Sequence, residues 1–192
     1  MPTPRIRHPK VVVLLIASGI ALAAGLSWPG EAARGATDDP ALMSRFEELS
    51  RNGNSSCSRA FMDSIATMPE AGRLQGSCCA PMKAHRYGEQ VVALREYSHI
   101  PEIPPDPYDV SASLAHELMS HYDDELTAAE QAVYDYAMAN SDEKGPCCCQ
   151  CWRWYVYGGL AKILIREHAF DGPQLVEVWN LSSGCGGAEH QH

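Results

Sequence analysis

The sequence predicts an all-α protein that folds as a single compact helical bundle of five to seven helices. Three observations predict this class. Apolar residues recur at three- and four-residue steps in several segments, helix-start signals precede several of these segments, and residues 152–168 are apolar nearly all round. A helix that is apolar on every face needs neighbours on every face, so we expect the bundle to close around residues 152–168.

The first half of the chain contains three predicted helices. Asp38 or Asp39 before Pro40 is a typical helix start, and a short helix over residues 41–49 follows it. Periodic apolar residues predict a second helix over residues 55–68, with Cys57 in its first turn. The same periodicity, after a proline that suits a first turn, predicts a third helix over residues 81–97.

The second half begins with residues 99–108, whose four prolines predict an extended connector. Apolar periodicity resumes after it, and Thr127 with Glu130 forms a capping box, a pairing that starts helices. A turn of aspartate, glycine and proline separates the apolar helix from a last short one. The predicted helices of this half cover residues 109–125, 127–140, 152–168 and 174–181.

The first 35 residues have the order of an export signal. Basic residues come first, an uncharged stretch of 16 residues follows at 11–26, and small residues surround position 33. A membrane-spanning helix needs about 20 apolar residues, so this stretch is short for one. We therefore expect residues 1–35 to be a cleaved signal peptide, with an uncleaved membrane anchor as the alternative. Either way the protein is predicted to be exported, to a periplasm, a cell surface or the medium.

Beyond residue 35 the chain is acidic. Residues 36–192 contain 11 basic and 23 acidic residues, which gives a formal charge of −12. Because nucleic acids need a basic surface, this charge argues against a nucleic-acid partner and is compatible with attracting cations. We expect these residues to form one helical, cysteine-rich domain over 36–187, followed by a flexible tail over 188–192.

All eight cysteines of the chain lie in the predicted domain, and four of them fall within residues 147–151. A buried free cysteine acts only as a small hydrophobic residue, so core packing does not explain four thiols so close together. Thiols outside the cytoplasm oxidise unless they hold a metal or are kept reduced by a partner. The sequence therefore points either to a soft-metal site or to disulfide and redox chemistry.

A metal site is the first interpretation. Thiolates are soft donors that select Cu(I), considered first here, and Zn(II), considered second. If the run from Pro146 onward is helical, Cys147, Cys148 and Cys151 share a face. If it is extended, Cys147, Cys149 and Cys151 line one side, and the proline favours the helical case. The predicted ligands are Cys147, Cys148, Cys149 and Cys151, joined by the doublet Cys78 and Cys79 and assisted by His85.

Disulfide chemistry is the second interpretation. Adjacent cysteines rarely bridge each other, so the run at 147–151 would pair with the distant cysteines Cys57, Cys78, Cys79 and Cys185 and tie helices together. The protein would then be a disulfide-stapled interaction module, or a thiol-disulfide oxidoreductase. No haem-attachment motif or nucleophile elbow occurs in the sequence, so metal sequestration, delivery or sensing is favoured over catalysis.

Residues 146–151 also carry a resemblance to a known family. The segment resembles the motif of bacterial exported PCYCGC-motif proteins, because it keeps the proline and three alternate cysteines. Cys148 replaces the tyrosine of that motif, and Gln150 replaces its glycine. The helix before the segment is similar to the aromatic helix that leads into the motif. The resemblance covers residues 133–180 and implies an exported protein with metal-ligating cysteines.

Overall fold

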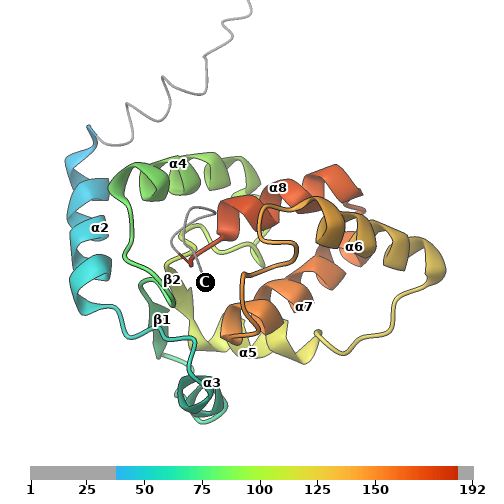
Figure 1. Cartoon of the computed structure of the whole chain (residues 1–192), viewed down its shortest axis with the longest axis horizontal. Coiled ribbons are helices and arrows are strands. Elements are labelled where there is room, and N and C mark those ends of the chain that lie inside the picture. Colours follow the sequence, from blue (N-terminus) through green and yellow to red (C-terminus); the bar gives the residue numbers. More distant parts are fainter. Residues whose placement is uncertain (1–37, 186–192) are drawn as a thin grey trace, which may run out of the picture.

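The computed structural model describes residues 38–185, so the predicted signal peptide and the predicted tail at 188–192 lie outside the described residues. Within this range the chain forms seven α-helices, one short 3-10 helix and a two-stranded sheet (Figure 1). The prediction of a helical fold is therefore confirmed. The elements are α2 (Pro40–Asn52), α3 (Arg59–Ile65), β1 (Arg73–Gln75), α4 (Ala84–Leu94), η1 (Arg95–Tyr97), β2 (Asp109–Ser111), α5 (Ala112–Ser120), α6 (Ala128–Asn140), α7 (Trp152–Glu167) and α8 (Gly172–Ser182).

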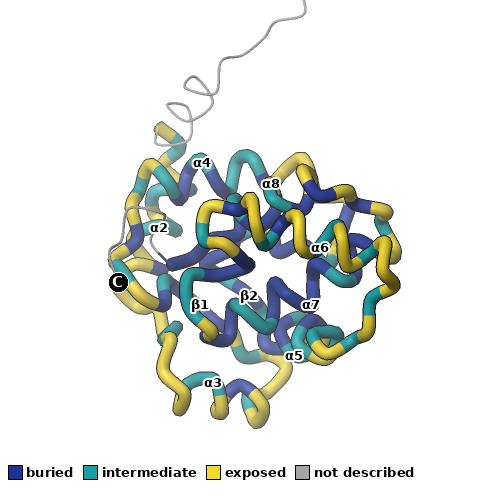
Figure 2. Tube along the Cα trace, turned by 45° about the vertical axis from the view of Figure 1, so that its right-hand side comes forward, coloured by how far each residue is buried: buried dark blue, intermediate teal, exposed yellow. Residues whose placement is uncertain are grey.

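Helix α7 is the centre of the main hydrophobic core, as its all-round apolar sequence predicts. It is buried on nearly every face, and α5, α6 and α8 pack against it (Figure 1). Figure 2 shows α7 almost entirely buried, whereas α3 and α6 carry many exposed residues. Trp152 and Trp179 are fully buried there, and the Trp179 indole N–H donates to the Tyr157 carbonyl at 3.0 Å. Among the helices of residues 38–185, none combines the length and apolar character that crossing a bilayer requires.

A second, smaller core joins α2 to α4. Leu42 and Leu49 on α2 are buried against Tyr87 on α4 and against Met82 just before it. The Tyr87 ring lies 5.7 Å from the Tyr108 ring, which extends this core toward the sheet. The contacts between α2 and α4 hold the two ends of the segment that connects these helices. That segment contains three of the cysteines.

The short antiparallel sheet is the element that the sequence analysis missed. Strand β1 pairs with β2 so that Leu74 lies opposite Val110. The prediction of one helix over residues 109–125 was wrong at its start, because residues 109–111 are extended and Ser111 caps α5 by accepting from the Leu114 N–H at 3.2 Å. Three-residue strands that pair over a long sequence separation leave no periodic pattern to detect.

Other helices also begin at residues that differ from the predicted ones. Ser58 caps α3 by accepting from the Phe61 N–H, so Cys57 lies in the preceding loop and not in the first turn of a helix. Helix α4 begins at Ala84, three residues later than predicted. The capping box of Thr127 and Glu130 is present at the start of α6. Residues 99–108 form turns, and their isoleucine side chains, Ile100 and Ile103, are buried in the core.

Asp109 ties α2 to the sheet. Its carboxylate accepts hydrogen bonds from the guanidinium groups of Arg45 on α2 and Arg73 on β1, and from the Gln75 amide at 3.1 Å. Burial by itself would raise the pKa of this carboxyl, but the hydrogen bonds from Arg73 and Gln75 and the charges of Arg73 and Arg45 hold the pKa below its usual range. The ionised form is therefore favoured by folding.

We expect Asp109→Asn to lower the free energy of unfolding by about 1–3 kcal/mol at neutral pH. Because the folded-state pKa is lowered, the contribution of Asp109 is fully present above about pH 4 and is lost as the pH falls further. Urea unfolding at pH 7 and pH 3 measures this: the difference between wild type and variant should shrink at pH 3. An equal difference at both pH values would contradict the assignment.

Candidate metal centre

The structure brings all eight cysteines together. They come from four loops: the one before α3, the one after β1, the one before α7 and the one after α8. The loop before α7 runs across the middle of the view in Figure 1. The sulfur atoms form four groups of three, and within each group all sulfurs lie within 4.8 Å of one another. The groups are Cys57 with Cys79 and Cys149, Cys78 with Cys147 and Cys185, Cys79 with Cys148 and Cys185, and Cys147 with Cys149 and Cys151.

A sharp turn before residue 147 determines how the cysteine run is presented. Lys144 and Gly145 both have positive φ, 54° and 151°, and the Ser141 hydroxyl accepts from the Gly145 N–H at 2.8 Å. A side chain on residue 145 would lie 2.8 Å from the Trp154 ring, so glycine is required there. The chain leaves this turn without helical geometry, and residues 147–151 are a series of bends.

The helical arrangement of the cysteine run was therefore the wrong alternative. Helix α7 begins only at Trp152, and Cys151 occupies its cap position with extended backbone angles. Cys147, Cys149 and Cys151 form one of the four sulfur groups, which is the grouping expected for an extended run. The proline at 146 follows the positive-φ turn and does not start a helix.

Four of the cysteines form a buried inner set, defined here as Cys78, Cys147, Cys151 and Cys185. The Cys147 Sγ lies 2.9 Å from the Cys185 Sγ and 3.6 Å from the Cys151 Sγ. The Cys78 Sγ lies 3.2 Å from the Cys185 Sγ and 4.0 Å from the Cys151 Sγ. Two thiolates on one tetrahedral zinc ion, with Zn–S bonds of about 2.3 Å, lie roughly 3.8 Å apart. The spacings of 3.6 and 4.0 Å are close to this value, and those of 2.9 and 3.2 Å are shorter.

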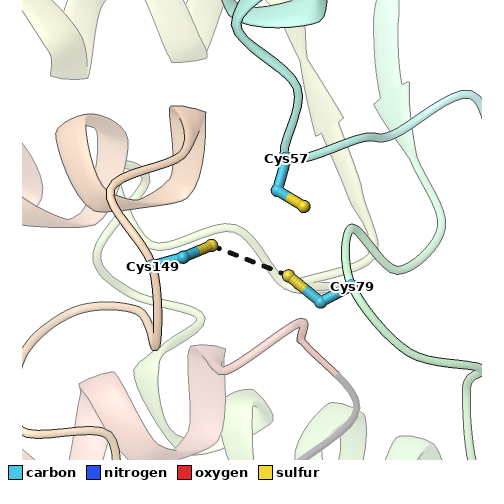
Figure 3. Close-up of side chains that lie close together, drawn as sticks. All are labelled: Cys57, Cys79 and Cys149. Carbon is cyan, nitrogen blue, oxygen red and sulfur yellow. Dashed lines mark hydrogen bonds between the residues drawn. The ribbon is translucent and has the colours of Figure 1, made fainter. Parts of the chain in front are cut away.

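Three further cysteines form an outer triad, Cys57, Cys79 and Cys149. Cys57 and Cys79 are exposed and Cys149 is half-buried. Figure 3 shows the three side chains converging from three separate loops, and the Cys79 Sγ lies 3.6 Å from the Cys149 Sγ. The outer triad is thus a second place where soft ligands meet, at the surface of the protein.

The inner thiols do not have equal acidity. Hydrogen bonds from Cys147, and then from Cys185 and Cys78, lower the pKa of Cys151, with a smaller contribution from the Arg153 backbone N–H in the first turn of α7. The same kind of contact, first with Cys148 and then with Cys149 and Cys151, raises the pKa of Cys147. The pKa of Cys78 is lowered as well, first through its contact with Cys147.

Arg153 is a buried cation next to the inner set. Its side chain is 1% exposed, its guanidinium donates to the carbonyls of Pro107 and Gly76, and it stacks on the Trp152 ring at 4.4 Å. Among residues 38–185, no carboxylate forms an ion pair with it. Burial by itself would lower the pKa of Arg153, but its electrostatic interactions with Tyr157 and with Cys78, Cys185 and Cys147 raise that pKa above the ordinary value.

The predicted ligands are brought together with one exception. The six cysteines predicted as ligands are all in the cluster, whereas His85 is exposed on α4 with its Nε2 3.2 Å from the Glu89 carboxylate, and it belongs to none of the groups found among the described residues. Cys57 and Cys185 complete the cluster but were expected only as disulfide partners. Their single sequence signal is residue type, because each is isolated from the other cysteines along the chain.

Comparison with known proteins adds no relative: no protein family matches the chain, and neither a curated protein nor a solved structure is similar to it. The resemblance of residues 133–180 to the PCYCGC-motif family stays a prediction. What can be concluded about function therefore comes from the fold and from the chemistry of the eight-cysteine cluster.

Proposed function

We propose that this protein binds soft metal ions outside the cytoplasm, Cu(I) first and Zn(II) second, for sequestration, delivery or sensing. The observation that carries the proposal is the convergence of eight sulfur atoms from four loops into overlapping groups of three. A disulfide joins two sulfurs and leaves no bond for a third. A metal ion binds several thiolates at once, and one thiolate can bridge two ions. Overlapping groups made only of soft donors are the arrangement that a soft-metal cluster needs.

Arg153 supports bound metal over disulfides. A disulfide is neutral, so oxidation of the inner set would leave this buried guanidinium without an anion, which costs several kcal/mol. A Cu(I) ion with three thiolates, or a Zn(II) ion with four, carries a net charge of −2. The buried cation is therefore opposite in sign to a metal-thiolate centre and offsets half of its charge.

The group size favours Cu(I) over Zn(II). Each group supplies three sulfurs, a number that suits Cu(I), whereas structural zinc sites are almost always tetrahedral with four ligands. The inner set offers four sulfurs, and this is why Zn(II) remains the second candidate. The export order of residues 1–35 and the resemblance to exported PCYCGC-motif proteins support a role outside the cytoplasm, with any membrane attachment made through the N-terminal segment.

Metal analysis of the full chain tests the proposal. Protein purified under reducing, anaerobic and copper-replete conditions is expected to hold at least one Cu(I) per chain, and its thiols should react with a thiol reagent only after the metal is removed. Protein that holds no soft metal would overturn the proposal. Finding all eight cysteines oxidised in protein isolated without reductant would support the disulfide-stapled module instead.

Two variants locate the bound metal. Cys147 belongs to two groups and contacts both Cys185 and Cys151, so Cys147→Ser is expected to reduce the copper bound per folded chain by at least half. His85→Ala is the control: His85 pairs with Glu89 away from the cluster, and its loss should leave copper content unchanged. Copper per folded chain, measured by elemental analysis and circular dichroism, distinguishes them, and equal losses in both variants would contradict the assigned site.

A further inference from the structure

We propose that the outer triad is the site through which Cu(I) is loaded into the buried inner set and passed on to an acceptor with soft ligands. This inference rests on the metal-binding function proposed above. It assigns different tasks to two parts of one cluster: exchange to Cys57, Cys79 and Cys149, and retention to Cys78, Cys147, Cys151 and Cys185.

Accessibility separates the two parts. A donor or acceptor ligand must touch the metal before it can take a place in its coordination shell. In the inner set, Cys185 is 0% exposed and Cys147 and Cys151 are each 2% exposed, so an incoming ligand does not reach a metal held there. Cys57 and Cys79 are exposed, and Figure 3 shows their side chains close to that of Cys149. Among the cysteines of residues 38–185, Cys57 and Cys79 are exposed, and Cys148 and Cys149 are half-buried.

Shared sulfurs connect the outer triad to the inner set. Cys79 follows Cys78 directly, and their sulfurs lie 3.7 Å apart. Cys79 also forms a group with Cys148 and Cys185. Cys149 belongs to the outer triad and to the group of Cys147 and Cys151. A metal ion moving from one group to the next therefore keeps at least one of its ligands and is never released to solvent.

The chemistry of each step is ligand exchange. One Cu–S bond forms as another breaks, and the copper stays Cu(I), so no oxidant or reductant takes part. A thiol that becomes a ligand gives up its proton, and the thiolate that leaves takes one up. The cluster therefore passes the ion along without a net change in charge, apart from the protons released when the ion first binds.

The loop that carries Cys57 is fixed by hydrogen bonds to the sheet and by one from the core, because the indole N–H of buried Trp152 donates to the Ser55 hydroxyl at 2.9 Å. Asn54 donates its side-chain amide to the Arg73 carbonyl at 2.9 Å and accepts from the Gln75 N–H at 2.8 Å. These bonds hold the Cys57 loop against β1, the strand that leads into Cys79. Because Cys57 itself is exposed and lies outside both hydrophobic cores, its thiol serves exchange and is dispensable for folding.

Transfer kinetics test the proposal. The full chain is loaded anaerobically with Cu(I) alone, and the transfer of copper to and from a chromogenic Cu(I) chelator is followed by stopped flow. Cys57→Ser is expected to slow copper transfer at least tenfold, both to and from the chelator. It should bind at most one Cu(I) ion fewer per chain than wild type. Cys185→Ser removes an inner ligand, so it should bind fewer Cu(I) ions per chain and hold them at least tenfold more weakly. Its copper transfer to the chelator should be as fast as that of wild type or faster.

Controls separate the possible failures. Ser56→Ala changes the same loop without removing a thiol, since it loses only the hydrogen bond from the Ser58 N–H, and it should exchange copper at the wild-type rate. If Cys57→Ser exchanges as fast as wild type, copper enters elsewhere and the loading role is overturned. If wild type binds no Cu(I), the proposed function itself fails, and this is a different outcome from normal binding with unchanged exchange.

Discussion

Arg153→Met is expected to weaken Cu(I) binding by roughly 30- to 700-fold. The guanidinium is buried beside the inner set, and its ionisable neighbours are cysteines and a tyrosine. At an effective dielectric constant of about 20, opposite charges a few ångströms apart attract by roughly 2–4 kcal/mol, and each 1.4 kcal/mol is a factor of ten in affinity. Methionine retains much of the volume and removes the charge, so the anionic metal centre loses its counter-ion.

The matched variant is Arg153→Lys, which keeps the charge. Both variants disturb the hydrogen bonds to the carbonyls of Pro107 and Gly76, so both are expected to lower the melting temperature of metal-free protein. The distinguishing measurement is the rise in melting temperature on Cu(I) loading, alongside affinity by chelator competition. Arg153→Lys should keep most of that rise and Arg153→Met should lose most of it. An unchanged rise in Arg153→Met would show that Arg153 only supports the fold.

Gly159→Ala is expected to destabilise the protein by about 3 kcal/mol or more. Helices α5 and α7 cross closely at this glycine, and a methyl group there would lie 1.8 Å from the Leu118 carbonyl oxygen and 2.8 Å from its carbon. Those atoms are backbone, so the clash is relieved only by separating the two helices. For a domain of this size the change corresponds to a fall in melting temperature of roughly 10 °C.

Gly158→Ala provides the control one position earlier. Its methyl group would meet the Tyr122 ring at 2.8 Å, and a side chain moves at lower cost than a backbone carbonyl. Replacing a helical glycine also gains up to about 1 kcal/mol in helix propensity. We expect Gly158→Ala to unfold within about 1 kcal/mol of wild type. Thermal unfolding by circular dichroism compares the two variants, and equal stability would contradict the close helix crossing.

Helix positions were predictable where local sequence determines them. The apolar segment at residues 152–168 became the buried helix α7, and the capping box of Thr127 and Glu130 starts α6 as predicted. The sheet was not predictable, because β1 and β2 are three residues each and are extended only through pairing with each other. The start of α4 also depended on tertiary packing, since Met82 is drawn into the core between α2 and α4 instead of entering the helix.

The sequence by itself determined that this is a helical protein with a concentration of thiols before its most buried helix, because apolar periodicity and residue type are local properties. Only the tertiary structure decided which thiols meet. Cys57 and Cys185, isolated along the chain, join the run at 147–151, and His85 stays away on α4. Tertiary packing also placed Arg153 beside the inner set. Such contacts form between loops whose positions are fixed by the packing of helices and strands that are distant in sequence. Local sequence patterns therefore do not predict which of these loops meet.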